Sequence, residues 1–221
     1  MIHWRKPFMI IFTAWETKVE YPQDNLPRYG NAVVPLTLPN TLTLLRVAAI
    51  PLLVALFYMQ APLSTLGTAG LFALAGVTDW FDGWLARRTG QTTAFGAFLD
   101  PVADKLIVAT ALVLLVDRYQ SVVVTLAACV IIGREIVVSA MREWMAQVGQ
   151  SAAVKVSQIA KVKTALQMGA IGFMLMIIPH ASNRYWCWLG ELVLVAAAVL
   201  TLASMVIYLK AFWRVLREQG S

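Results

Sequence analysis

The amino-acid sequence predicts an all-α, polytopic membrane protein with six transmembrane helices and both termini in the cytoplasm. Only 14 % of the 221 residues are charged, against about a quarter in soluble domains, and the mean hydropathy is +0.69. A helix that crosses a bilayer needs about 20 predominantly apolar residues. Six stretches meet that need: 40–59, 63–86, 96–116, 121–143, 160–179 and 187–209.

The distribution of Lys and Arg predicts the orientation of these spans. Basic residues lie before the first span, in every second link and after the last span, which places those segments in the cytoplasm by the positive-inside rule. The other links contain only Arg118 and Arg184. A net charge of +6 would favour nucleic acid if the cations formed a surface stripe. Because they flank apolar spans instead, we expect no nucleic-acid partner.

Three domains follow from this pattern. Residues 36–212 form the six-helix domain and residues 213–221 a cytoplasmic tail. Residues 1–35 form an N-terminal extension that contains Trp, basic and apolar residues. Such a segment suits the membrane surface, and an unstructured extension is equally consistent with it.

The first span opens with a polar stripe. Asn40 follows Pro39 and is expected to cap the helix. Asn40, Thr43 and Arg46 recur at every third position, so they share one helix face. A helix cap with a buried polar stripe explains them, and so does contact with a substrate.

The remaining links alternate between the two sides of the membrane. Residues 58–62, 116–120 and 179–186 are expected as outer turns. Residues 87–96 and 147–158 are expected as inner links, the first of them polar and punctuated by glycine.

Four aspartates surround the first inner link. Asp79 and Asp82 end the second span, and Asp100 and Asp104 begin the third. Their spacings place each pair on one helix face, and the short link makes the two helices neighbours. The sequence therefore predicts four carboxylates close together, just below the cytoplasmic surface.

Four clustered carboxylates require neutralisation by protons or cations. Two divalent metals would balance their charge, and oxygen ligands favour Mg²⁺ or Mn²⁺. Paired metals of this kind clamp the oxygens of a phosphoryl transfer. Gly83 and Ala86 leave room for a ligand, and Arg87 offers a forked cation to a phosphate. The alternative is a pathway for protons or ions in a transporter.

The stretch resembles the signature of the CDP-alcohol phosphotransferase family, D-x-x-D-G-x-x-A-R followed by G-x-x-x-D-x-x-x-D. Every fixed position matches; the matching residues are Asp79, Asp82, Gly83, Ala86, Arg87, Gly96, Asp100 and Asp104. Within the family, the stretches "LPNTLTLLR", "GAFLDPVADKL", "IIGREIVVSAMREWMA" and "KVKTALQ" are most similar to bacterial members that use glycerol 3-phosphate as acceptor.

The resemblance implies transfer of a phosphatidyl group from CDP-diacylglycerol to sn-glycerol 3-phosphate, with release of CMP. It implies that Asp79, Asp82 and Asp100 bind metal and that Asp104 is both a ligand and the general base. It also places the cytidine diphosphate at Gly83, Ala86 and Arg87, with Thr93 as a further candidate. A homodimer in the bacterial inner (plasma) membrane, in contact with membrane lipids and with its active site on the cytoplasmic side, is expected.

The phosphate of the acceptor needs a second cationic site. The candidates are Arg134, Arg142, Lys161 and Lys163. Each has a structural alternative: Arg134 can pair with Glu135 or an aspartate, and the lysines can anchor a helix at the inner surface. A sibling enzyme that uses an inositol phosphate, phosphatidylglycerol or serine is the nearest alternative function.

Overall fold

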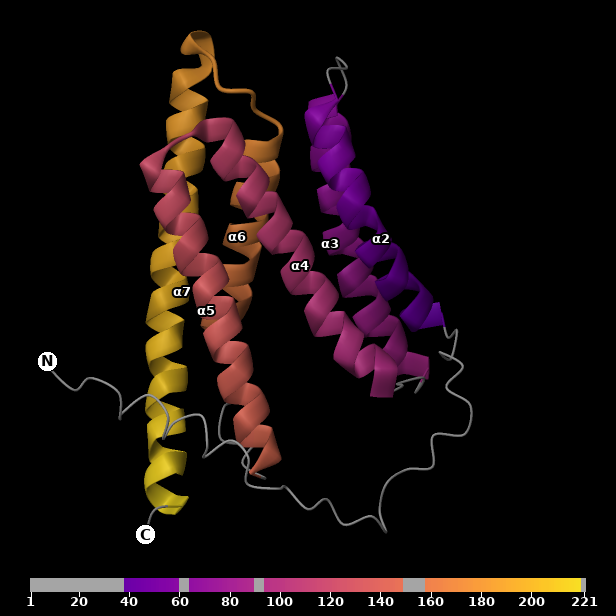
Figure 1. Ribbon diagram of the computed structural model, residues 1–221, viewed down its shortest axis with the longest axis vertical. Helices are drawn as coiled ribbons and strands as arrows, with labels where there is room; N and C mark the ends of the chain where they lie inside the picture. The colour runs from indigo at the N-terminus through magenta and orange to yellow at the C-terminus, as the bar shows by residue number, and fades with distance from the viewer. Residues whose placement is uncertain (1–37, 60–63, 90–93, 149–157, 220–221) are drawn as a thin grey trace, which may run out of the picture. The chain divides into compact units, whose positions relative to one another are not determined.

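The computed structural model describes the backbone of residues 38–59, 64–89, 94–148 and 158–219. Side chains are described within these ranges except at 38–39, 80–89, 94, 97, 158–162 and 218–219. The extension 1–35 and Thr93 lie outside the described residues. The described chain is helical throughout its regular elements, which confirms the predicted all-α class (Figure 1). The elements are α2 (Leu38–Tyr58), α3 (Ser64–Thr89), α4 (Ala94–Tyr119), α5 (Val122–Gln147), α6 (Gln158–Leu175), the 3-10 helix η4 (Ala181–Asn183) and α7 (Arg184–Gln219).

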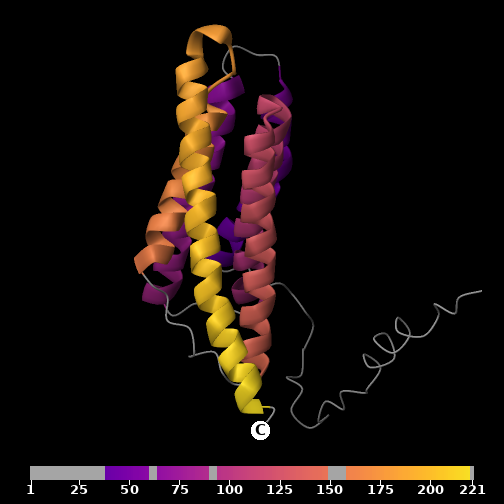
Figure 2. The same ribbon diagram turned by 90° about the vertical axis from the view of Figure 1, so that its left-hand side faces the viewer.

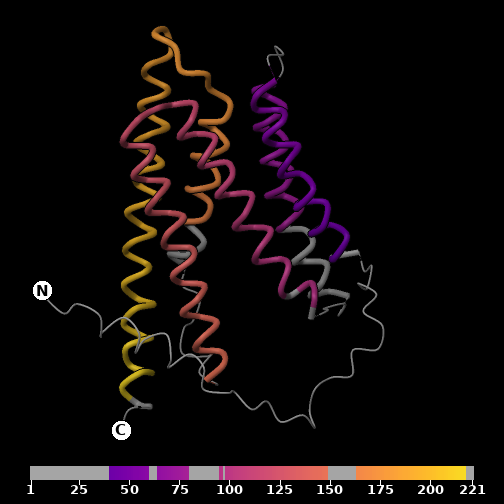
Figure 3. The backbone as a smooth tube through the Cα atoms, in the orientation of Figure 1, coloured from indigo at the N-terminus to yellow at the C-terminus, as the bar shows by residue number. Residues whose placement is uncertain are grey.

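Helix α4 lies between two groups of helices, α2 with α3 and α5 with α6 and α7 (Figures 1 and 3). Helix α7 packs along both α5 and α6, and the turned view shows α5 and α7 side by side (Figure 2). Apolar side chains from several helices meet in one core; examples are Leu53, Phe72, Leu112, Ile171 and Leu194, each no more than 2 % exposed. This packing fixes which helix faces meet at the polar ends.

Three of the described helical segments are long and apolar enough to cross a membrane: Asn40–Tyr58, Val122–Gln147 and Ala181–Arg217. Only 22 %, 33 % and 28 % of their most apolar windows are buried inside the protein. Most of their apolar surface therefore faces outward, as expected of helices surrounded by lipid. A polytopic membrane protein accounts for this. The other three predicted spans, in α3, α4 and α6, carry charged residues near one end.

The start of α2 corrects one expectation. The helix begins at Leu38, so Asn40 lies inside its first turn and is not the N-cap. Proline is well accommodated at the first helical positions, because its missing N–H has no intrahelical partner there and its φ already suits a helix. The helix can therefore include Leu38 and Pro39, the two residues that precede Asn40.

The link between α4 and α5 is shorter than the predicted turn at 116–120. Helix α4 continues to Tyr119, and α5 begins at Val122. Gln120 has a φ of 46°, the left-handed conformation with which many helices end. Its backbone N–H still donates to the carbonyl oxygen of Val116 at 3.0 Å. Two residues, Gln120 and Ser121, are therefore enough to reverse the chain.

Helix α6 ends at Leu175 and not at residue 179 as predicted. Arg118 Nη1 donates to the carbonyl oxygen of Leu175 at 2.8 Å, and the Tyr119 hydroxyl donates to that of Met174 at 3.2 Å. These bonds satisfy carbonyls that the end of a helix leaves unpaired. Pro179 also disfavours a helical conformation at the residue before it. Helix α7 then exceeds the predicted span 187–209 in both directions.

Candidate active site

Two of the four aspartates share one cation. Asp79 lies near the end of α3 and Asp100 in the second turn of α4, with side chains 39 % and 40 % exposed. Arg46 Nη1 lies 2.6 Å from Asp79 Oδ1 and 3.6 Å from Asp100 Oδ1. Arg46 itself is only 2 % exposed. A buried guanidinium from α2 thus joins carboxylates from two other helices.

The polar stripe of α2 packs against this pair. Asn40, Thr43 and Arg46 are each 2 % exposed, and the Thr43 hydroxyl donates to Asp100 Oδ1 at 3.0 Å. The sequence left open whether the stripe caps the helix or contacts a substrate. The structure gives Thr43 and Arg46 a third role, because both hold aspartates of the signature in place.

Asp79 and Asp100 both contact Arg46 and supply oxygen atoms at one place. Asp79 and Asp100 present oxygens from two helices to one positive charge, and carboxylate oxygens are the ligands that Mg²⁺ and Mn²⁺ prefer. Among the residues whose side chains are described, no group of three His, Cys, Asp or Glu is close enough to hold a metal. Asp82 is on α3, three residues after Asp79, but its side chain lies outside the described residues. A complete ligand set would therefore need Asp82 or a closer approach of Asp104.

Asp104 faces a cavity of about 400 Å³ that is lined by α4, α5, α6 and α7. It follows Asp100 by four residues on α4, so the two carboxylates lie one turn apart on one face. Arg134, Glu135 and Lys163 line the same cavity. The structure thereby places the predicted general base and two predicted phosphate ligands around one space.

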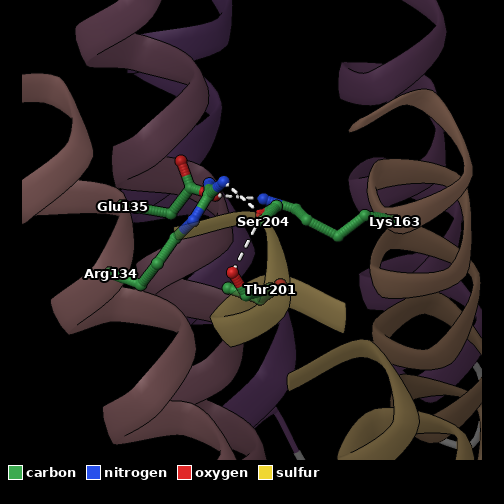
Figure 4. Close-up of polar contacts among 5 residues, drawn as sticks. All are labelled: Arg134, Glu135, Lys163, Thr201 and Ser204. Atoms are coloured by element: carbon green, nitrogen blue, oxygen red, sulfur yellow. Dashed lines mark hydrogen bonds and ion pairs between the residues drawn. The ribbon is translucent and has the colours of Figure 1, made fainter. Parts of the chain in front are cut away.

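One carboxylate oxygen of Glu135 bonds to both Arg134 and Lys163 (Figure 4). Glu135 Oε1 accepts from Arg134 Nη1 at 3.1 Å and from Lys163 Nζ at 2.8 Å. Arg134 Nη2 donates to Ser204 Oγ at 2.7 Å, and the Ser204 hydroxyl donates to the Thr201 carbonyl oxygen at 2.8 Å. Arg134 is 7 % exposed and Lys163 4 %. The structural alternative for Arg134, a pair with Glu135, is thus present in this structure.

Of the remaining predicted basic and cytidine-site residues, only Arg142 has a described side chain. Arg142 lines the cavity, while the partners found for Glu135 are Arg134 and Lys163. Lys161 lies on α6, but its side chain is outside the described residues. Gly83, Ala86 and Arg87 lie on α3, in the part of that helix whose side chains are not described.

Sequence reasoning named Arg46 in the polar stripe of the first span, where its spacing from Asn40 and Thr43 was the signal, and it missed two other residues of this site. Gln167 follows Lys163 by one helical turn and lines the cavity. Ser204 had the weakest signal, since it is one small hydroxyl residue in a long and mostly apolar stretch.

Residues 36–205 match the CDP-alcohol phosphatidyltransferase family, and the chain belongs to that family. Similar curated relatives come from Escherichia coli strain K12 and Shigella flexneri serotype 5b. Each is 50 % identical over 174 residues, which is 79 % of this chain and 93 % of the relative. A relative from Pseudomonas fluorescens is 49 % identical over 186 residues, 84 % of this chain and 94 % of that protein. All three are named CDP-diacylglycerol–glycerol-3-phosphate 3-phosphatidyltransferase.

Proposed function

We propose that this chain transfers the phosphatidyl group of CDP-diacylglycerol to sn-glycerol 3-phosphate and releases CMP. The observation that carries the proposal is the shared cavity, in which Asp104 lies with the buried cations Arg134 and Lys163. An acceptor with a hydroxyl at one end and a phosphate at the other needs a base and cations in one space. The names of relatives about 50 % identical support the same reaction.

The bond changes follow from this placement. Asp104 accepts the proton of the acceptor hydroxyl, whose oxygen forms a bond to the β-phosphorus of the donor. The bond between that phosphorus and the CMP oxygen breaks, and CMP leaves. By motif position, Gly83, Ala86 and Arg87 hold the cytidine diphosphate, with Thr93 as a further contact.

The carboxylates Asp79, Asp82, Asp100 and Asp104 would hold two divalent cations, Mg²⁺ or Mn²⁺. Such ions, when bound, screen the charge of the diphosphate and of the departing CMP. Arg46 donates a hydrogen bond to Asp79, and Thr43 donates one to Asp100. These bonds hold the two carboxylates at the proposed metal site. The support for the metal site is the convergence of oxygens from α3 and α4 on one cation.

The acceptor phosphate is expected at Arg134 and Lys163, with Arg142 and Lys161 as further cations. One oxygen of Glu135 already bonds to both Arg134 and Lys163. These two cations are therefore spaced to share a single oxyanion. A phosphate oxygen would make the same kind of charge-assisted bond.

The donor requires a membrane setting. Its diacyl chains reach the site from the bilayer, so the six helices are proposed to cross the membrane with both termini and the aspartates on the cytoplasmic side. The domain comprises residues 36–212, preceded by the extension 1–35 and followed by the tail 213–221. By its resemblance to bacterial members, the chain is expected as a homodimer in the bacterial inner membrane.

The test is CMP release by the purified full-length protein in detergent, with CDP-diacylglycerol, Mg²⁺ and one acceptor at a time. Release with glycerol 3-phosphate only, and its loss with EDTA, is the expected result. Release with serine, an inositol phosphate or phosphatidylglycerol would retain the reaction and contradict the assignment of the cations. Folded protein that releases no CMP with any acceptor would favour the ion-transport alternative.

A further inference from the structure

Gln167 on α6 carries a buried acceptor atom that bonds to none of the described side chains. The residue is 4 % exposed and lines the cavity that contains Asp104. Within the part of the chain that the structure describes, its Oε1 atom has no hydrogen-bond partner. Buried side-chain oxygens almost always have one, so this amide is arranged for a group that enters the cavity.

The position of Gln167 relative to the cations indicates what kind of chemical group its amide would bind. Gln167 follows Lys163 by four residues on α6, so the two side chains lie on one face, a single turn apart. Both line the cavity, together with Arg134. The amide is uncharged and offers both an acceptor and donors. It therefore suits a neutral hydroxyl on a molecule whose anionic end lies at the neighbouring cations.

The acceptor in the proposed reaction has such a hydroxyl. sn-Glycerol 3-phosphate carries a phosphate, a hydroxyl that attacks the donor, and a second hydroxyl at C2 that does not react. The phosphate is assigned to Arg134 and Lys163 and the attacking hydroxyl to Asp104. The C2 hydroxyl is the polar group of the acceptor that still needs a partner.

We propose that Gln167 binds this non-reacting hydroxyl and thereby selects glycerol 3-phosphate over acceptors that lack it. The proposal rests on the proposed function. A site built to hydrogen-bond a hydroxyl rejects the analogue without it, because the buried polar group of the protein is then left unpaired.

The experiment compares two acceptors with two forms of the full-length protein. The acceptors are sn-glycerol 3-phosphate and 3-hydroxypropyl phosphate, which lacks only the C2 hydroxyl. The wild-type protein is expected to prefer glycerol 3-phosphate by about 10- to 100-fold in kcat/KM. In Gln167→Met, which keeps the shape and removes the amide, the preference should fall to within about threefold.

Two control variants separate recognition from packing and charge. Gln167→Glu keeps an acceptor oxygen at the same length, so its added charge should slow both acceptors while the preference remains. Thr201 also has a buried oxygen, Oγ1, that has no partner among the described side chains, but Thr201 does not line the cavity. Thr201→Val should therefore keep the wild-type preference. Gln167→Leu repeats the comparison if the Met variant does not purify folded.

The proposal is overturned if Gln167→Met slows both acceptors equally and the preference stays at its wild-type value. It is also overturned if the wild-type protein uses both acceptors equally well, which would mean that water satisfies the amide. A failure of the proposed function is a different result, because wild-type protein would then release no CMP with glycerol 3-phosphate.

Discussion

Ser204→Ala tests whether α7 positions the guanidinium of Arg134 for the acceptor phosphate. The hydroxyl of Ser204 donates to the Thr201 carbonyl, which orients its lone pairs toward Arg134 Nη2 at 2.7 Å. Arg134 and Ser204 are 7 % and 3 % exposed, so water cannot readily replace the lost oxygen. A hydrogen bond to a charged group contributes about 1.5–3 kcal/mol.

The lower part of that range is expected, because Arg134 keeps its bond to Glu135. About 1.5 kcal/mol corresponds to a roughly tenfold rise in KM for glycerol 3-phosphate. The value of kcat should change by less than about threefold, since the contact serves ground state and transition state alike. CMP release at saturating CDP-diacylglycerol and varied acceptor measures both constants.

Ser121→Ala is the matched control, because Ser121 is the N-cap residue that precedes α5 and its side chain makes no capping hydrogen bond. Its KM should equal that of the wild type. If folded Ser204→Ala shows an unchanged KM, the bond does not position Arg134. A fall in kcat at constant KM would also refute the reasoning, since it would place the contact in the chemical step.

Two further variants test the base and the packing. Asp104→Asn should lower kcat by about 10²- to 10⁴-fold without loss of thermal stability in detergent, and near-normal turnover would remove Asp104 from the role of base. In Gly190→Ala the new Cβ would lie 2.7 Å from Met174 Cγ, and such overpacking costs about 1–3 kcal/mol, so Tm should fall. Gly76→Ala meets only the flexible Cε of Met168 at 2.9 Å and should lower Tm less; equal decreases would contradict this account of the α6–α7 contact.

Much of the fold follows from the local composition of the chain, and it can therefore be predicted from the sequence. The apolar stretches predicted helices because their length and composition suit no other element in a bilayer. Each of the six predicted spans overlaps a described helix, although several ends were misplaced, those of α4, α6 and α7 among them. Those ends depend on partners elsewhere: the hydrogen bonds from Arg118 and Tyr119 that terminate α6 come from a different helix.

The candidate site likewise has one part that the sequence predicts and another part that depends on contacts between helices. The aspartate signature was readable because helical spacing alone puts Asp79 with Asp82 and Asp100 with Asp104. The sequence could not predict whether Arg134 binds a phosphate or pairs with Glu135. The pair depends on rotamers set by Lys163 and Ser204, which lie on two other helices.

The sequence by itself determined the helical class, the family and the aspartate signature. Tertiary structure alone decided that Arg46 joins Asp79 to Asp100, that Ser204 holds Arg134, and that Gln167 faces the cavity of Asp104. Arg46 and Asp79 are 33 residues apart in the chain, and Arg134 and Ser204 are 70 residues apart. Apart from the polar stripe of α2, the helices that supply them are apolar on most sides, so no amphipathic pattern marks their inward face. Packing against the neighbouring helices selects that face, and it does so only in the folded protein.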